Sequence, residues 1–129
     1  MKKTALITIA LLLTSPALAQ DSADRTFVQK RYKIEGTAKI ENVDGETHLV
    51  LSEDFKTKNG PDLKVYLTKK PIESLTGQDV KNDATKIGVL KSNKGAQSYI
   101  LPADLDLADY ESVVIHCEAF TVLWGGFDL

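Results

Sequence analysis

Hydrophobic and polar residues alternate along much of the chain, and this alternation is the pattern of half-buried β-strands. In residues 33–41 every second residue is apolar or small, and the residues between them are lysine, glutamate or threonine. Residues 42–45 (Asn-Val-Asp-Gly) then supply a tight turn, and residues 47–51 resume the strand pattern. We therefore predict a β-hairpin with the Asp-Gly pair at its tip.

Five later stretches complete the predicted elements. Residues 63–68 alternate between apolar and polar side chains and predict another half-buried strand. Residues 87–90 and 98–101 flank the turn-forming sequence Ser-Asn-Lys-Gly and predict a second hairpin. Residues 113–122 form the most apolar run and predict a central strand, or a strand pair with a bulge. The polar stretch 69–85 predicts the longest loop, with one helical turn.

The spacing of these strands and turns indicates the fold class. Beyond the first twenty residues no long segment keeps a helical period, and no internal repeat or linker divides the chain. We predict an all-β fold, a single antiparallel β-sandwich or barrel-like domain of seven to nine short strands, after a signal peptide. We assign residues 1–19 to that signal peptide, residues 20–35 to an N-terminal extension with a candidate first strand, and residues 36–129 to the β domain.

The first twenty residues have the three parts of a secretory signal. Lys2 and Lys3 give a positive start, a short apolar run follows, and Ala-Leu-Ala at residues 17–19 forms a cleavage site. The apolar run is too short to span a bilayer, which needs about 20 apolar residues. We expect Sec export from a bacterial cytoplasm, cleavage after residue 19, and a periplasmic or secreted product without a membrane span. The alternative is an N-terminal anchor that is retained.

The charge and the cysteine content of the chain limit which partners and which cysteine chemistry we expect. The chain has 16 Lys+Arg and 18 Asp+Glu, so loss of Lys2 and Lys3 with the signal leaves a net charge of −4. No basic stripe stands out along the sequence, and we expect no nucleic-acid partner. Cys117 is the single cysteine, so the chain can form no internal disulfide. In an oxidising compartment such a cysteine is buried, modified, ligated or paired with another molecule.

Strand geometry predicts where the Cys117 side chain points. Alternate residues of a strand share a face, so Cys117 is expected beside Ile115 on one face, and His116 on the other. His116 is then badly placed to act as a base for the neighbouring thiol. Two alternatives stay open for Cys117: a small hydrophobic residue of the core, or a thiol whose surroundings stabilise the thiolate.

Other candidate chemistry is weaker. His116 and Glu118 could form a metal site with His48 from another strand, but a solvated polar patch explains them better, and we assign no metal site. We expect Phe120, Trp124 and Phe127 in the core. The sequence contains no hydrolase or transferase motif and no phosphate-binding loop, so we leave enzymatic activity undecided and expect no stand-alone enzyme.

Three segments carry a resemblance to a known family. They are residues 60–67 (GPDLKVYL), residues 88–99 (GVLKSNKGAQSY) and residues 110–120 (YESVVIHCEAF). In order and spacing they resemble the electron-transfer DM-thirteen domain, and the resemblance runs from about Gly36 to the end of the chain. Members of that family are β-rich domains of secreted or cell-surface proteins, found in animals beside DOMON and cytochrome b-type modules.

The resemblance implies a redox role, and the family cysteine corresponds to Cys117. Through it the resemblance makes Cys117 a candidate redox thiol and a candidate haem or metal ligand, with an exported or membrane redox protein as partner. No spacing in the sequence supports haem, so we name no cofactor. We expect an exported domain with a redox or electron-transfer accessory role through Cys117. The alternative is a non-catalytic binding or structural module in which Cys117 is a core residue.

Overall fold

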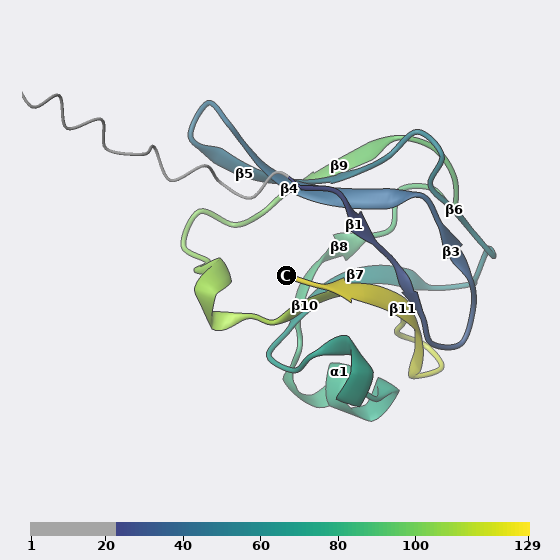
Figure 1. The fold of residues 1–129 in the computed structure, drawn as a ribbon. Helices are drawn as coiled ribbons and strands as arrows, with labels where there is room; N and C mark the ends of the chain where they lie inside the picture. The colour runs from purple at the N-terminus through teal and green to yellow at the C-terminus, as the bar shows by residue number, and fades with distance from the viewer. Residues whose placement is uncertain (1–22) are drawn as a thin grey trace, which may run out of the picture.

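The computed structural model describes residues 23–129, so the predicted signal peptide and its cleavage site lie outside the described residues. Within that range the chain forms three antiparallel sheets and little helix, which confirms the all-β, sandwich-like prediction (Figure 1). The first sheet has the strand order β1-β4-β5-β9. Its strands are β1 (Arg25–Thr26), β4 (Thr37–Val43), β5 (Glu46–Leu51) and β9 (Gln97–Ile100).

The second sheet has the order β2-β11-β10-β7-β8 and contains the most deeply buried strands. Its strands are β2 (Val28–Gln29), β7 (Leu63–Thr68), β8 (Thr85–Val89), β10 (Ser112–Cys117) and β11 (Val122–Asp128). A third sheet pairs the two-residue strands β3 (Ile34–Glu35) and β6 (Lys56–Thr57). The described residues thus form eleven strands; seven have four or more residues, and the other four are two-residue pieces.

The main hydrophobic core lies between the first and second sheets. The first sheet contributes Ala38, Leu49 and Leu51, all at most 2% exposed. The inner face of β7 and β10 contributes alternate residues, as the period of a strand requires: Leu63, Val65, Leu67, Val113, Ile115 and Cys117. Burial of these apolar side chains from both sheets is what holds the two layers together.

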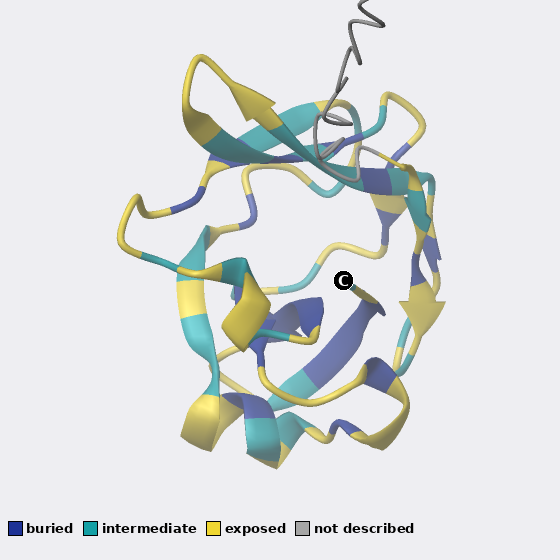
Figure 2. Ribbon diagram, turned by 60° about the vertical axis from the view of Figure 1, so that its left-hand side comes forward, coloured by how far each residue is buried: buried dark blue, intermediate teal, exposed yellow. Residues whose placement is uncertain are grey.

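A second hydrophobic cluster covers the outer face of the second sheet. Here Tyr66, Val114 and Leu123 pack against side chains of the polar segment that the sequence predicts to be the longest loop. That segment holds a short 3₁₀ helix, η1 (Ile72–Ser74), and the helix α1 (Gly77–Asp83). The molecule therefore has three layers, with α1 on the side of the second sheet away from the first sheet (Figure 1). Strands β10 and β11 are buried along nearly their whole length (Figure 2).

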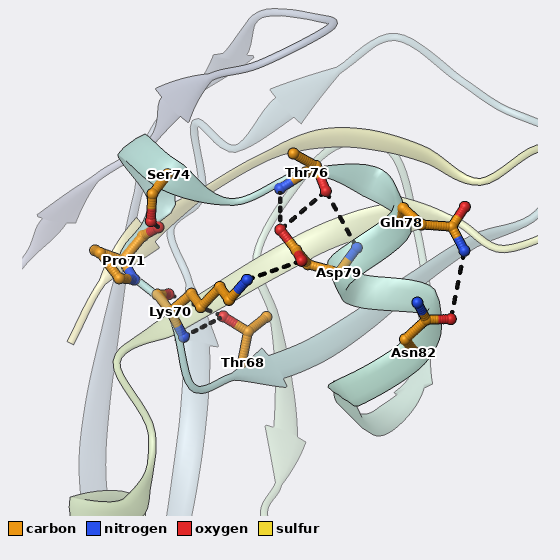
Figure 3. Close-up of polar contacts among 8 residues, drawn as sticks. All are labelled: Thr68, Lys70, Pro71, Ser74, Thr76, Gln78, Asp79 and Asn82. Atoms are coloured by element: carbon orange, nitrogen blue, oxygen red, sulfur yellow. Dashed lines mark hydrogen bonds and ion pairs between the residues drawn. The ribbon is translucent and has the colours of Figure 1, made fainter.

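A capping box fixes the start of α1. The Thr76 hydroxyl accepts a hydrogen bond from the Asp79 N–H at 3.2 Å, and the Asp79 carboxylate accepts one from the Thr76 N–H at 3.0 Å. Lys70 Nζ donates to the same carboxylate at 2.9 Å (Figure 3). Lys70 and Thr76 together hold the pKa of Asp79 at about 2. These contacts satisfy free backbone groups of a helix only seven residues long.

The first predicted hairpin is confirmed and the second is wrong. Strands β4 and β5 pair around Asp44 and Gly45, which both have positive φ (+50° and +84°), as a type I′ turn requires. Strands β8 and β9, in contrast, do not pair with each other. Strand β8 pairs with β7 in the second sheet and β9 pairs with β5 in the first, so residues 90–96 cross between the layers.

The apolar run 113–122 was predicted as a central strand or a strand pair with a bulge; it contains the central strand β10, a turn and the first residue of β11, and the bulge lies beyond the run, at Trp124. Strand β10 ends at Cys117, a turn follows, and β11 continues through Gly125 and Gly126 to residue 128. Glycine inside a strand marks a close approach of another backbone. At Gly126 a Cβ would lie only 2.2 Å from the Val113 oxygen, so a larger residue does not fit there. Phe120 lies in the turn and is 68% exposed, so its prediction as a core residue is wrong.

Short helical pieces complete the chain. The 3₁₀ helix η2 (Leu107–Asp109) lies in the crossing segment before β10. No helix of residues 23–129 has the length and apolar character needed to cross a membrane.

Candidate functional site

Cys117 is the last residue of β10 and lies in the main core. Its neighbours across the sheet are Leu63 in β7 and Val122 in β11, and its own exposure is 1%. Val113 and Ile115 lie in the same cluster, which confirms the predicted face of Cys117. The sulfur is a free thiol surrounded by hydrocarbon, an environment typical of an unreactive cysteine.

The three segments that carry the family resemblance meet around Cys117. Residues 60–67 include β7, residues 110–120 include β10, and these two strands pair along six residues. Residues 88–99 join the other edge of β7, where the Leu90 N–H donates to the Leu63 carbonyl at 2.9 Å. Segments far apart in the sequence thus converge on one end of the second sheet, and Cys117 lies at that end.

A cleft opens at the same end of the sheet. Residues 59–63 and 89–93 line it, and its volume is about 350 Å³. Leu63 is both part of the cleft wall and the cross-strand neighbour of Cys117, so the cleft and the thiol share a neighbouring residue. The Asp62 carbonyl also accepts a hydrogen bond from the Glu118 N–H at 3.0 Å, which ties the cleft to the residue after Cys117.

A network of ion pairs lies just beyond Cys117. Glu118 binds Lys64 on β7 and Lys86 on β8, the latter at 2.8 Å, and Lys64 also binds Asp62 at 3.1 Å. The two lysines hold the pKa of Glu118 at about 2, and the carboxylates raise the pKa of Lys64. Burial, helped by Glu118, raises the pKa of Tyr66 to about 12. The network holds the ends of three strands together with fixed charges.

His116 faces the opposite layer from Cys117, as the strand period predicts. It is 1% exposed, and its ring meets the Tyr66 ring edge-on at a centroid distance of 5.5 Å. Its Nδ1 atom is buried without a hydrogen-bond partner. Burial lowers the pKa of His116, against the opposing effect of Glu118. The imidazole is therefore a neutral core group and cannot serve as the base of the thiol.

The contact between buried Trp124 and half-buried Tyr32 was not anticipated from the sequence. Trp124 is the extra residue of a bulge in β11, because His116 pairs with Leu123 and Ile115 pairs with Gly125. Its ring packs on Tyr32 at a centroid distance of 4.2 Å. Its carbonyl accepts hydrogen bonds from three successive amides, those of residues 30–32, at 3.0–3.2 Å. The Lys-Arg-Tyr-Lys sequence at residues 30–33 was the signal that could have drawn attention to this place.

The residues around Cys117 do not fit a metal or haem. His48 lies on β5 in the first sheet, away from the strand that carries His116 and Glu118. Among residues 23–129 no three histidine, cysteine or acidic side chains are grouped for a metal. Cys117 is enclosed by packed side chains and His116 points to the other layer, so no second ligand stands beside the sulfur.

Comparison with known proteins gives the family. The family model described as Electron transfer DM13 matches residues 26–129. The chain belongs to the electron transfer DM13 family. The match begins within the predicted N-terminal extension, and it includes the strands around Cys117 and the Trp124 bulge. Neither the curated proteins nor the solved structures contain a match to this DM13 domain.

Proposed function

We propose that this DM13 domain is an exported electron-transfer accessory domain whose redox group is Cys117. The observation that carries the proposal is the convergence of the three family-like segments on the end of the sheet where this thiol lies. The family's description supports a redox-related role. The partner is another redox protein, either exported or in the membrane, because Cys117 has no second cysteine in its own chain.

Burial of the thiol sets a condition on this role. Thiol–disulfide exchange requires a thiolate to approach a sulfur directly, and Cys117 is 1% exposed. Leu63 lines the cleft and neighbours Cys117 across the sheet, so local opening of residues 59–63 is a way to expose the sulfur. We therefore propose a gated thiol, which reacts when this segment moves.

A second candidate function has a specific observation in its favour. The same 1% exposure and hydrocarbon surroundings suit a cysteine that only fills the core. The domain would then be a non-catalytic binding or structural module. The two candidates differ in whether Cys117 reacts while the protein is folded.

Thiol labelling separates the two candidates. A gated thiol reacts with an aromatic disulfide reagent faster than global unfolding allows, whereas a core thiol reacts only at the rate set by unfolding. Leu63→Ala removes the neighbouring side chain, and Leu101→Ala is a matched control because both leucines are buried in the same core. We expect Leu63→Ala to speed labelling beyond its loss of stability. Equal effects of the two variants would support the core candidate.

Export has its own test. Residues 1–19 have the composition of a cleaved Sec signal, and this supports a periplasmic or secreted location. Expression of the full chain in a bacterium should give a periplasmic product whose first residue is Gln20, as measured by intact-mass spectrometry. A product that keeps Met1 and sediments with membranes would contradict the proposed location.

A further inference from the structure

A concentrated basic surface lies on the small sheet formed by β3 and β6. Ile34 and Thr57 of these strands are buried, and their neighbours Lys33, Lys56 and Lys58 are exposed. Lys94 is exposed and pairs with Lys56 through a β-bridge. Together with Arg31 these residues form what we call the basic face: Arg31, Lys33, Lys56, Lys58 and Lys94.

The basic face holds five of the 14 basic residues that follow the signal peptide. Glu35 lies opposite Lys56 and pairs with Lys33 at 3.5 Å, and Glu53 and Asp54 lie in the exposed turn that leads into β6. Without the predicted signal peptide the chain has a net charge of −4, so the part of it outside the basic face is more acidic. Among residues 23–129 the basic face is thus suited to attract negative charge.

Fold stability does not account for this arrangement. Lys56 stands directly across from Lys94, and like charges in that position destabilise a sheet. The register of β3 and β6 also brings residue 33 opposite residue 58, a second pair of lysines. Repulsion of this kind is relieved when carboxylates of another molecule lie over the face.

The backbone under the basic face is firmly held. The Thr57 N–H donates to the Asn93 carbonyl at 2.9 Å, and the Thr57 hydroxyl donates to the Lys33 carbonyl at 2.9 Å. The Trp124 carbonyl fixes residues 30–32 by accepting all three of their amides. A surface that is ordered before binding loses less conformational entropy when a partner arrives.

The aromatic pair lies at the border of the basic face. Tyr32 is half-buried on Trp124, with Lys58 Nζ at 4.8 Å and the Arg31 guanidinium carbon at 5.5 Å from its ring centroid. The Trp124 indole N–H donates to the Lys58 carbonyl at 3.2 Å. Tyrosine, tryptophan and arginine together are the composition of protein–protein binding centres. A membrane is less suited, because a wide anionic plane would also face the acidic remainder of the chain.

We propose that the basic face and the Tyr32–Trp124 pair form a docking surface for an acidic protein. Carboxylates of the partner pair with Lys33, Lys56, Lys58 and Lys94, and an apolar side chain of the partner packs against Tyr32. The surface acts in binding alone, so it does not depend on the chemistry of Cys117.

The proposal can be tested with poly-L-glutamate as the acidic probe. Trp124 is the single tryptophan, so its fluorescence reports binding beside Tyr32 directly. We expect saturable binding at low ionic strength that weakens with salt. Lys56→Gln with Lys58→Gln should raise the Kd roughly fivefold to tenfold, and the matched double variant Lys69→Gln with Lys81→Gln should leave it unchanged.

Thermal melts give a second measurement. Lys56→Gln alone should melt at or above the parent temperature, because it removes the repulsion from Lys94.

Equal weakening of poly-L-glutamate binding by both double variants would mean that net charge, and not the basic face, attracts the probe. Binding to anionic phospholipid vesicles but not to poly-L-glutamate would assign the face to membranes. Either outcome, or a lower melting temperature of Lys56→Gln, would overturn the proposal, and none of them bears on the labelling of Cys117.

Discussion

Two adjacent residues of β10, His116 and Cys117, show how a strand distributes chemistry between layers. Cys117 points into the core between the sheets, and His116 points toward the layer that contains α1. Both are 1% exposed, so each is surrounded by packed side chains but by different ones. Replacement of Cys117 and replacement of His116 therefore test two different layers, and each gives a separate prediction.

Two replacements of Cys117 compare the loss of stability caused by a buried hydroxyl with that caused by a small void. Cys117→Ser places a hydroxyl among Leu63, Val122 and Ile115, where nothing accepts its proton, and should cost about 1–3 kcal/mol. Cys117→Ala leaves a small void and should cost less. Urea unfolding of both variants measures the difference. If serine were tolerated as well as alanine, the thiol would lie in a more polar place than the core.

Burial of His116 makes the stability of the fold depend on pH. The folded-state pKa lies below the ordinary value of 6.5, so between the two values only the unfolded chain binds the proton. Stability is complete above pH 6.5 and falls as the pH drops below it. A second fall begins below pH 4.5, where Glu118, with its folded pKa of about 2, stays ionised only in the folded state.

Two variants separate these two losses of stability. His116→Phe keeps an aromatic ring beside Tyr66 and should remove the first loss. Glu118→Gln should reduce the second loss, and the part that stays belongs to Asp79, whose folded pKa is also about 2. Urea unfolding between pH 8 and pH 3 measures both. A pH profile that His116→Phe does not alter would mean that the imidazole is solvated in the folded protein.

Among the strands and helices, turn residues determine one hairpin, whereas packing determines which sheet a strand joins. The β4–β5 hairpin follows from two residues with positive φ, Asp44 and Gly45. The place of β8 and β9 follows instead from which sheet buries them. Helix α1 exists because Thr76 and Asp79 cap it and Val80 packs beneath it, although its sequence is polar.

The hairpin turn gives a prediction with a matched control. A Cβ on Gly45 would meet nothing within 4 Å, so Gly45→Ala tests the φ of +84° alone and should cost about 1–2 kcal/mol. Gly88 also has open space around it but an ordinary φ, so Gly88→Ala should be neutral or stabilise by up to about 1 kcal/mol. Similar melting temperatures of the two variants would contradict this account of the turn.

The features predicted correctly from the sequence are those that depend on residues close together in the chain. The first hairpin, the faces of Cys117 and His116 and the central strand at the start of residues 113–122 follow from the two-residue period and from turn residues. The second hairpin failed because strands β8 and β9 each find a partner far away in sequence, which no local pattern records. The Tyr32–Trp124 pair was missed for the same reason, since 92 positions separate the two residues.

For the molecule as a whole, β11 is the strand on which the layers depend. It lies between β10 and β2 in the second sheet, and its residues serve both hydrophobic clusters: Trp124 and Phe127 in the main core, Leu123 in the outer one. Asp128 also accepts a hydrogen bond from the Ile72 N–H at 2.8 Å. Loss of this strand removes contacts from every layer.

Gly126→Ala tests this dependence. The added Cβ would lie 2.2 Å from the Val113 oxygen and 2.9 Å from the Val114 Cα, and backbone atoms of a central strand cannot move aside cheaply. We expect loss of the cooperative thermal transition, followed by near-ultraviolet circular dichroism, which reports the packing around Trp124. Retention of that transition would show that β10 and β11 can separate without unfolding the domain.

The central position of β11 also sets the order of events during synthesis. Residues 28–32 are among the first of the domain to leave the ribosome, yet their partners, Trp124 to Gly126, are among the last. The second sheet therefore cannot close around β2 before residues 124–126 have been synthesised, so the domain completes its fold only after its last strand is available.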